Sequence, residues 1–364
     1  MLLIQRKVFL LILCYHSLRE KFVDNFIFYT NIDFFTNYFY SIAEVTYMQH
    51  LYYESLRRRI LTQHKTFPLL EEKIQRAEAG IFGEMLVTRE LSELSHPHFD
   101  WITNFQFLSP QNASYQIDFI LILQHCLVIL EVKNITGMAR YMPHSHEFQR
   151  IKSTGEIDSF RNPFDQAFRH QQLLEMLLKK LNISLPVLYA VIMTNPNCTI
   201  DSSLKGYPIF HLSYLRRYLN DLQNTATTQK INIQRVKKQL LKYSQQIPPQ
   251  KIVTTDELIR GIICIQCNGQ MNYTHGISNC LKCGYKSRLG IHETIRDYYL
   301  LIGDQITNER LRWFSLIESK YTASKILSRL AFEKQGNSVA TTYTIPPQFV
   351  YTYDNIEAWK KKDG

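Results

Sequence analysis

Residues 116–134, QIDFILILQHCLVILEVKN, form two apolar runs separated by a short polar break. Both runs are rich in branched aliphatic residues, so they predict two buried strands that fold back on each other as a hairpin. The same stretch nevertheless contains Asp118, Glu131 and Lys133. Because burying a charge without a partner is costly, these three side chains are the first candidates for a functional site.

The register of the hairpin decides whether the two acids meet. A two-residue turn at 124–125 sets Asp118 directly opposite Glu131. Opposed Cβ atoms in an antiparallel pair lie about 5 Å apart, where two negative charges repel. An apolar sheet tolerates such a pair if a cation lies between the carboxylates or if one of them is protonated. Alternation puts Lys133 on the same face, whereas a slip of one residue would separate the acids.

These residue types indicate metal-assisted phosphodiester hydrolysis. Carboxylates on a rigid sheet suit Mg²⁺ or Mn²⁺, which keep several waters and complete their shell with substrate phosphate. We expect Asp118, Glu131 and the Val132 carbonyl to hold the ion and Lys133 to orient the attacking water. The alternative is that Glu131 and Lys133 only pair with each other at a strand end.

A regular series of elements surrounds the hairpin. The predicted order is a helix at 68–94, strands at 100–108, 115–123 and 127–134, a polar loop containing Gly137 and Gly155, a helix at 162–181 and a strand at 186–195. Asn162 followed by proline predicts the start of the second helix. Gly80 and Gly83 weaken the first helix, so their expected benefit is close approach to another backbone. The series predicts an α/β core.

Four short motifs occur in order along this series: GIFGE at 80–84, QID at 116–118, ILEVKN at 129–134 and NPFDQ at 162–166. Together they resemble the nuclease-related domain family, NERD, of the PD-(D/E)xK nuclease superfamily, over roughly residues 75–195. The resemblance implies a restriction-endonuclease-like core and a catalytic set consisting of Glu84, Asp118, Glu131 and Lys133, with Gln166 in support. Ile117 stands where the superfamily pattern has proline, although isoleucine is usual in the narrower family.

Two of these residues have structural alternatives. Glu84 lies beside the apolar stripe of its helix and could be an ordinary surface carboxylate. Gln166 lies at the start of the second helix and could serve only the helix itself.

The cysteines indicate a metal site of a different kind. Seven cysteines occur, and four of them form two Cys-x-x-Cys pairs separated by twelve residues: Cys264, Cys267, Cys280 and Cys283. Each pair suits a tight turn that presents two thiolates to a tetrahedral Zn²⁺, and Gly269 and Gly284 suit such turns. With all four ligands from the protein, the zinc would be structural. The pattern resembles a zinc ribbon and favours a reducing cytoplasm over a disulfide framework.

The segments around the cysteines are less distinctive. Residues 201–260 are rich in Gln, Lys and Thr and predict a helical connector and linker. Two short helices and a strand follow the cysteines. They are compatible with a winged helix-turn-helix in which Thr322 caps a recognition helix carrying Lys325 and Arg329. The alternative is a small helical cap on the ribbon.

The N-terminal stretch MLLIQRKVFLLILC contains a seven-residue apolar run, too short to span a bilayer. No small-residue cleavage site follows it. We expect residues 1–47 to be a poorly structured extension, with Met48 as the working start and no stable membrane anchoring. A membrane anchor is the alternative.

Composition supports a globular, basic protein. The 364 residues predict two or three domains at roughly 100 to 200 residues each. Lys and Arg number 42 against 32 Asp and Glu, a net charge of +10, which favours a polyanionic partner without identifying it. We expect a nuclease-like domain at 48–200, a linker at 201–260, a ribbon at 261–290 and a helical tail at 291–364.

The combined expectation is a cytoplasmic, Mg²⁺-dependent nuclease that hydrolyses DNA phosphodiester bonds, in DNA processing or repair. DNA is favoured over RNA because the tail resembles a duplex reader and no RNA-stacking module is visible. The alternative is a non-catalytic nucleic-acid-binding or scaffold protein that retains a nuclease fold.

Overall fold

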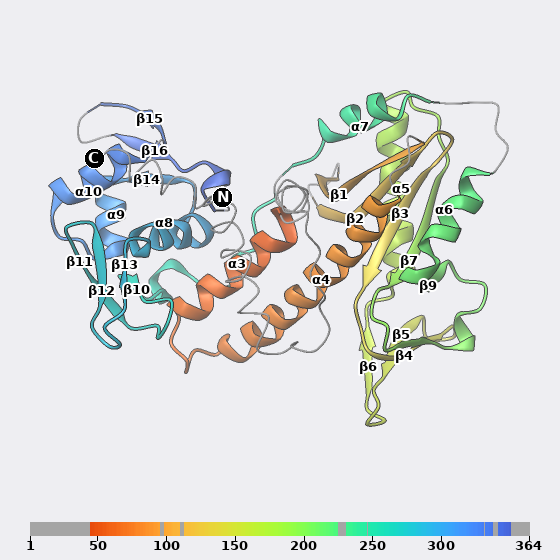
Figure 1. Cartoon of the computed structure of the whole chain (residues 1–364), viewed down its shortest axis with the longest axis horizontal. Helices are drawn as coiled ribbons and strands as arrows, with labels where there is room; N and C mark the ends of the chain where they lie inside the picture. Colours follow the sequence, from red (N-terminus) through yellow and green to blue (C-terminus); the bar gives the residue numbers. More distant parts are fainter. Residues whose placement is uncertain are drawn as a thin grey trace.

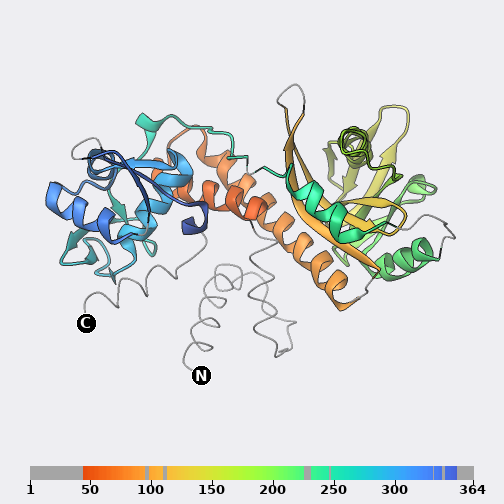
Figure 2. The same cartoon turned by 90° about the horizontal axis from the view of Figure 1, so that it is seen from above.

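The computed structural model describes residues 44–94, 98–109, 113–224, 231–245, 247–330, 332–337 and 341–350. Its elements form two groups joined by the long helix α4 (Phe67–Glu93), as Figures 1 and 2 show from two sides. The expected extension 1–47 lies outside the described residues as far as residue 43. Helix α3 (Glu44–Arg59) begins at residue 44, so the last four residues of that range are helical and not poorly structured. Among the described helices, none combines the length and the apolar character that crossing a bilayer requires.

The first group is built on a five-stranded sheet of order β1-β2-β3-β7-β9. The strands are β1 (Phe99–Leu108), β2 (Ser114–Leu123), β3 (Leu127–Lys133), β7 (Val187–Met193) and β9 (Ile209–His211). Helices α4 and α6 (Leu215–Gln223) cover one face, and α5 (Pro163–Lys180) and α7 (Ile233–Leu241) cover the other. The expected α/β core is confirmed.

The apolar runs of β2 and β3 follow from this layering. Phe119 and Leu121 of β2 face α4 and α6, whereas Ile120 and Ile122 face α5 and α7. A strand covered on both faces needs apolar residues at every position, which explains a continuous run in place of alternation.

The expected register of the hairpin is confirmed. Strands β2 and β3 pair antiparallel with Phe119 opposite Leu130. The next position outward sets Asp118 opposite Glu131, as the two-residue turn at 124–125 predicts.

The expected polar loop after β3 is wrong. Its residues form the strands β4 (Gly137–Met142), β5 (Glu147–Ile151) and β6 (Ile157–Phe160), which with β8 (Cys198–Ile200) make a four-stranded sheet of order β6-β5-β4-β8. Only a few apolar side chains, among them Tyr141 and Phe148, face its small core, so the polar outer face dominates the composition. Gly137 is required here, because a Cβ would lie 2.4 Å from the carbonyl oxygen of Ile151.

The second group contains the cysteines and the tail. Strands β10 (Ile262–Ile263), β11 (Gln270–Thr274), β12 (Ile277–Cys280) and β13 (Lys286–Ser287) form one sheet. The chain continues through α8 (Gly290–Leu301), β14 (Gln305–Thr307), α9 (Asn308–Ser315), α10 (Lys320–Arg329), β15 (Glu333–Gln335) and β16 (Thr342–Thr344). Short 3₁₀ turns complete the chain: η1 (Ser202–Leu204), η2 (Leu212–Tyr214), η3 (Thr255–Glu257) and η5 (Pro347–Val350).

The two helices expected in the tail are confirmed as α9 and α10, whereas α8 was not expected. The expected cap of α10 is wrong. Ser319 is the N-cap, and its hydroxyl accepts a hydrogen bond from the backbone N–H of Thr322 at 3.2 Å. A serine and a threonine three residues apart compete for this role, and the helix begins after the first of them.

One hydrophobic core unites the second group with α3 and the first half of α4. Leu56, Leu70 and Ile74 pack in the same cluster as Met271 of the ribbon and Ile295 of α8. The other half of α4 contributes to the core of the first group. Helix α4 is therefore a continuous strut between the two cores, about 40 Å long at 1.5 Å per residue.

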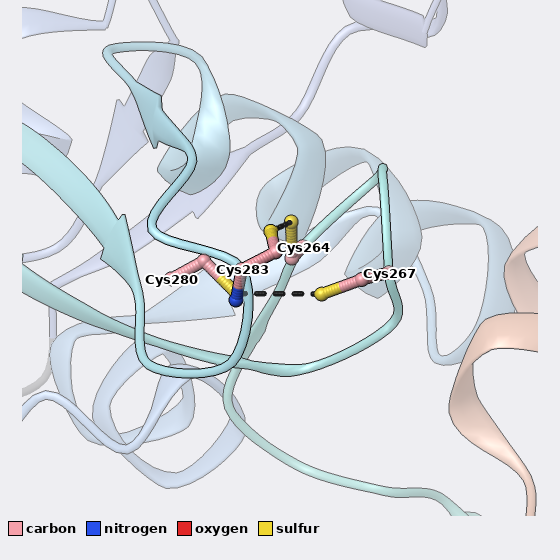
Figure 3. A group of neighbouring side chains, drawn as sticks. All are labelled: Cys264, Cys267, Cys280 and Cys283. Carbon is pink, nitrogen blue, oxygen red and sulfur yellow. Dashed lines mark hydrogen bonds between the residues drawn. The ribbon is translucent and has the colours of Figure 1, made fainter.

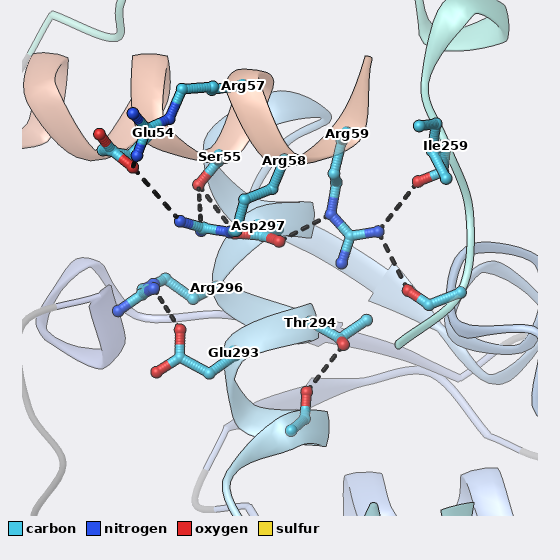
Figure 4. A network of polar contacts seen from close by, with 12 residues as sticks. Glu54, Ser55, Arg57, Arg58, Arg59, Ile259, Glu293, Thr294, Arg296 and Asp297 are labelled. Carbon is cyan, nitrogen blue, oxygen red and sulfur yellow. Dashed lines mark hydrogen bonds and ion pairs between the residues drawn. The ribbon is translucent and has the colours of Figure 1, made fainter. Parts of the chain in front are cut away.

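A buried ionic network fixes α3 to α8 (Figure 4). Asp297 accepts hydrogen bonds from Ser55 at 2.8 Å, Arg58 at 2.9 Å and Arg59 at 2.7 Å. Arg59 also donates to the carbonyls of Ile259 and Gly261, each at 3.0 Å. The network thus joins α3, α8 and the segment that leads into the ribbon.

Candidate functional site

Glu131 and Lys133 form the centre of the site, at the end of β3. Glu131 is 1% exposed, and the Lys133 ammonium donates to its Oε1 at 2.7 Å. Within the described residues Oε2 of Glu131 has no hydrogen-bond partner, and Nδ1 of His170 lies 3.8 Å from it. Burial, followed by the charges of Arg169 and Lys133, lowers the pKa of His170 to about 4, so its ring is neutral near pH 7. One oxygen of a buried carboxylate is thus left without a donor.

Asp118 is held beside this pair from the neighbouring strand. Its Oδ2 accepts a hydrogen bond from the backbone N–H of Val132 at 2.8 Å. Burial and the charge of Glu131 raise the pKa of Asp118 to about 7, against the opposing effect of Lys133. Burial lowers the pKa of Lys133, but the two acids more than compensate and raise it. The structure therefore brings these three groups together on one face of the hairpin.

Helix α4 brings Glu84 to the same end of β3. A Cβ on Gly83 would lie 3.1 Å from side-chain atoms of Val132 and Asn134, so any larger residue would need these side chains to shift. The amide of Asn134 also donates to the carbonyl of Ala79 at 2.9 Å. Gly83 therefore packs closely as expected, although against side chains and not against another backbone. The surface alternative for Glu84 is excluded because that carboxylate is buried.

Two amides missed by the sequence analysis connect Glu84 to the hairpin. The side-chain amide of Asn104 in β1 donates to Oε2 of Glu84 at 2.9 Å, and that of Gln116 in β2 donates to Oδ1 of Asn104 at 2.7 Å. Asn104 has a left-handed backbone with φ +49° and interrupts the β1–β2 ladder opposite Asp118. Alternation could have found Gln116, which lies two residues before Asp118. Asn104 gave no signal beyond a polar residue in a strand.

Gln166 and His170 come from α5. Asn162 caps this helix as expected, accepting the backbone N–H of Phe164 at 2.9 Å. Gln166 is half-buried in the first turn, and no hydrogen bond joins its side chain to the carboxylates in the part of the chain that is described. His170 follows four residues later and reaches Glu131. Helical spacing from Gln166 was the available signal for it.

The carboxylates offer fewer ligands than the cysteines do. Across the described ranges, the four cysteines alone form a set of three or more His, Cys, Asp or Glu ligand atoms that all lie within 4.8 Å of one another. A divalent ion at the hairpin would therefore be held by one or two carboxylates plus water and substrate, which is how Mg²⁺ is commonly bound. The donor-free oxygen of Glu131 fits that arrangement.

The four cysteines fit a structural zinc ion (Figure 3). Sγ of Cys264 lies 3.7 Å from Sγ of Cys283, and Sγ of Cys267 lies 3.4 Å from Sγ of Cys280. A tetrahedral zinc with bonds of about 2.3 Å places its sulfurs about 3.8 Å apart. Gly269 is favoured here, because a Cβ would lie 2.8 Å from the Cβ of Lys282 and 3.2 Å from the Cys267 sulfur.

The pKa values of the cysteine thiols also favour a bound zinc ion. Backbone N–H groups of Cys283 and Lys282 donate to the Cys280 sulfur and lower the pKa of that thiol to about 6. Burial and hydrogen bonds with the neighbouring thiols raise the pKa of Cys267 to about 12. The Cys280 thiol thus favours the thiolate form at neutral pH, whereas a dication must displace the proton of Cys267.

Comparison with known proteins gave two matches. A family model described as nuclease-related domain, NERD, matches residues 79–194, a range that contains the five candidate site residues. An uncharacterized protein of Bacillus anthracis is 30% identical over 148 residues, which cover 40% of this chain. The match spans 64% of that relative, less than two thirds of its length. No solved structure matches the chain significantly.

Proposed function

We propose that the protein is a metal-dependent nuclease that hydrolyses phosphodiester bonds in DNA, and the match of residues 79–194 to the nuclease-related domain model supports this proposal. One observation carries the proposal: a buried carboxylate, Glu131, has an oxygen without a donor and is flanked by Asp118 and Lys133. Lys133 balances only one of the two carboxylates that meet there, so a further cation is the natural partner for that oxygen.

Asp118 and Glu131 would hold the metal, together with the main-chain carbonyl of Val132. Their oxygen donors suit Mg²⁺ or Mn²⁺. Such an ion would stabilise the negative charge that develops on the phosphate during attack. The hydrogen bond from the Val132 N–H to Oδ2 fixes Asp118, and its other oxygen would be the one to bind the ion.

Lys133 would act on the attacking water and on the phosphate. The Lys133 ammonium donates one hydrogen bond to Glu131. An ammonium has three donor hydrogens, so the others remain available for substrate. Water attacks phosphorus, one P–O ester bond breaks, and the products are a phosphate monoester and an alcohol. Glu84, held by Asn104, would bind or orient groups at the edge of the same site.

The substrate and location are part of the proposal. The net charge of +10 favours a polyanion, and the second group of elements, with its ribbon, supplies a separate surface for nucleic acid. We assign the protein to DNA processing or repair in the cytoplasm, where the four thiols would stay reduced.

The test is cleavage of linear, nicked and single-stranded DNA with Mg²⁺ or Mn²⁺. The wild type should cut at least one of these substrates, and Lys133→Ala should lose activity by 100-fold or more, on the order of the loss of one transition-state contact. Lys152→Ala is the matched control, because Lys152 pairs with Glu156 at 2.9 Å on the surface of the same domain. Its activity should match the wild type.

Absence of DNA cleavage would favour a second function, non-catalytic binding of nucleic acid. The Glu131–Lys133 ion pair neutralises one of the two carboxylates at the site, and this structural role requires no catalysis. If the wild type cuts none of the substrates with either ion but still retards DNA in a salt-dependent way, the protein is a non-catalytic nucleic-acid-binding protein.

A further inference from the structure

The tail has a distinctive order of elements. Residues 290–344 run as helix, strand, helix, helix, strand, strand, from α8 to β16. The three strands form one antiparallel sheet of order β14-β16-β15. Helices α9 and α10 are joined by the short connection 316–319, which begins with Leu316 in a left-handed conformation at φ 60°. A winged helix-turn-helix has this order, with β15 and β16 as the wing.

We propose that residues 290–344 form a winged helix-turn-helix unit whose helix α10 binds in the major groove of duplex DNA. The proposal deepens the proposed function by naming the form of nucleic acid that is bound. It also stands on its own, because binding can be measured without cleavage.

Helix α10 has one buried and one exposed face. Ala323, Ile326 and Leu327 pack in the core of the second group. The opposite face is exposed at four positions with helical spacing: Tyr321, Ser324, Lys325 and Ser328. Tyr321 is 79% exposed, and Figure 1 shows α10 at the outer end of its group, away from α4. Hydroxyl and ammonium groups on one exposed stripe are the groups that read base edges and phosphates.

The charge of this surface complements a polyanion. Helix α10 carries Lys320, Lys325 and Arg329 and no acidic residue. No ion pair joins Lys320 or Lys325 to an acid within the described part of the chain. Lysines that the protein itself leaves without an acid are free to pair with phosphates.

The ribbon extends the basic surface beside α10. Residues 258–292 contain four Lys or Arg and no Asp or Glu. Arg329 lies close enough to Tyr273 of the ribbon to lower its pKa against the larger, raising effect of burial. The ribbon and the last turn of α10 are therefore neighbours, and both present positive charge.

The first turn of α10 is held rigidly by α9. The amide of Asn308 donates to the Lys320 carbonyl at 2.9 Å and to the Ser324 hydroxyl at 2.8 Å. Ser319 caps the helix. A recognition helix needs a fixed orientation, because base contacts depend on placing a few side chains to within about 1 Å.

Duplex DNA fits this surface better than RNA does. The major groove of B-form DNA is about 12 Å wide and admits a helix, whereas the major groove of A-form RNA is deep and too narrow for one. An α10 that binds in a groove should therefore prefer duplex DNA over duplex RNA of the same sequence.

The experiment measures fluorescence anisotropy of a labelled duplex with full-length, zinc-loaded protein. Every sample carries Lys133→Ala and contains no Mg²⁺, so that cleavage does not intervene. Adding Lys325→Glu should weaken binding about 10-fold or more and reduce the dependence of log K on log salt by about one unit. Lys179→Glu is the matched control, since Lys179 is exposed on α5 of the other group. It should bind within twofold of the parent.

Tyr321→Ala is the second variant. Because the Tyr321 side chain is exposed, its removal should leave folding unchanged, and it should also weaken DNA binding. Unchanged affinity in both variants would overturn the proposal. So would competition by duplex RNA or single-stranded DNA as effective as competition by duplex DNA. A wild type that cuts nothing, together with weaker binding by Lys325→Glu, would remove the nuclease proposal and leave this one intact. DNA cleavage by the wild type, together with unchanged DNA binding in both variants, would support the nuclease proposal and overturn the winged-helix proposal.

Discussion

Nε of Arg59 lies 2.7 Å from Oδ2 of Asp297, and both side chains are almost completely buried. The guanidinium also stacks over Phe314, with its carbon 4.3 Å from the ring centroid. A helix near the start of the described chain is thereby fixed to a helix more than 230 residues later. Helix α3 is followed directly by α4, which reaches the core of the first group, so this ion pair lies in the connection between the two groups of elements.

Removing the acid from this pair should destabilise the second group strongly. Asp297→Ala leaves Arg59 buried without its partner, and breaking a buried pair in this way costs about 3–5 kcal/mol. The free energy of unfolding from a denaturant titration should fall by that amount. Asp256→Ala, an exposed acid in η3, is the control and should change it by less than about 0.5 kcal/mol. A loss below about 1 kcal/mol for Asp297→Ala would contradict the importance assigned to the network.

The same network predicts how stability depends on pH. Burial raises the pKa of Asp297, but Arg58, Arg59 and Arg296 lower it more, to about 2 from the ordinary 3.8. A carboxyl group whose pKa is lower in the folded state stabilises the fold above its unfolded pKa, and this is lost as pH falls through the folded pKa. The contribution, about 2 kcal/mol, should therefore be complete above about pH 4 and disappear towards pH 2.

The measurement is a series of urea titrations between pH 5 and pH 2 on the wild type and Asp297→Asn. The difference in unfolding free energy between them should shrink as pH falls through this window. A difference that stays constant down to pH 2 would show that ionisation of Asp297 does not contribute.

The zinc assignment predicts a stoichiometric loss of metal. Cys267→Ser removes one of four ligands, so purified protein should contain well under one zinc per chain where the wild type contains one. The ribbon shares its core with α8 and α3, so the variant should also unfold at lower denaturant. Cys126→Ala, a buried cysteine of the first group, is the control and should keep its zinc. Equal zinc content in wild type and Cys267→Ser would contradict the site.

Local sequence patterns predicted the parts of the site that local geometry determines. The register of Asp118 and Glu131 follows from turn length and strand alternation, which act over a few residues. The close approach at Gly83 follows from glycine in a helix, where only packing explains its presence.

The remainder depends on contacts between distant segments. The bond from Asn104 to Glu84 joins residues 20 apart, and the one from Arg59 to Asp297 joins residues 238 apart. Neither pair leaves a periodic signal in the sequence. The strands β4 to β6 were missed for a related reason, because a small core needs few apolar residues and the polar outer face then resembles a loop.

Asn104 supplies the last prediction, because it holds Glu84 from a left-handed backbone position. Asn104→Asp keeps the shape of the side chain, and aspartate also tolerates the left-handed backbone conformation. The change replaces the amide donor with a second negative charge. If Glu84 serves the proposed reaction, the cleavage rate should fall roughly 10- to 100-fold, as for other changes behind a site's ligands, while DNA affinity stays within twofold. Asn182→Asp is the matched control, since Asn182 is also left-handed, at φ 55°, but lies on the surface after α5. Equal cleavage rates in the two variants would show that the position of Glu84 does not matter for catalysis.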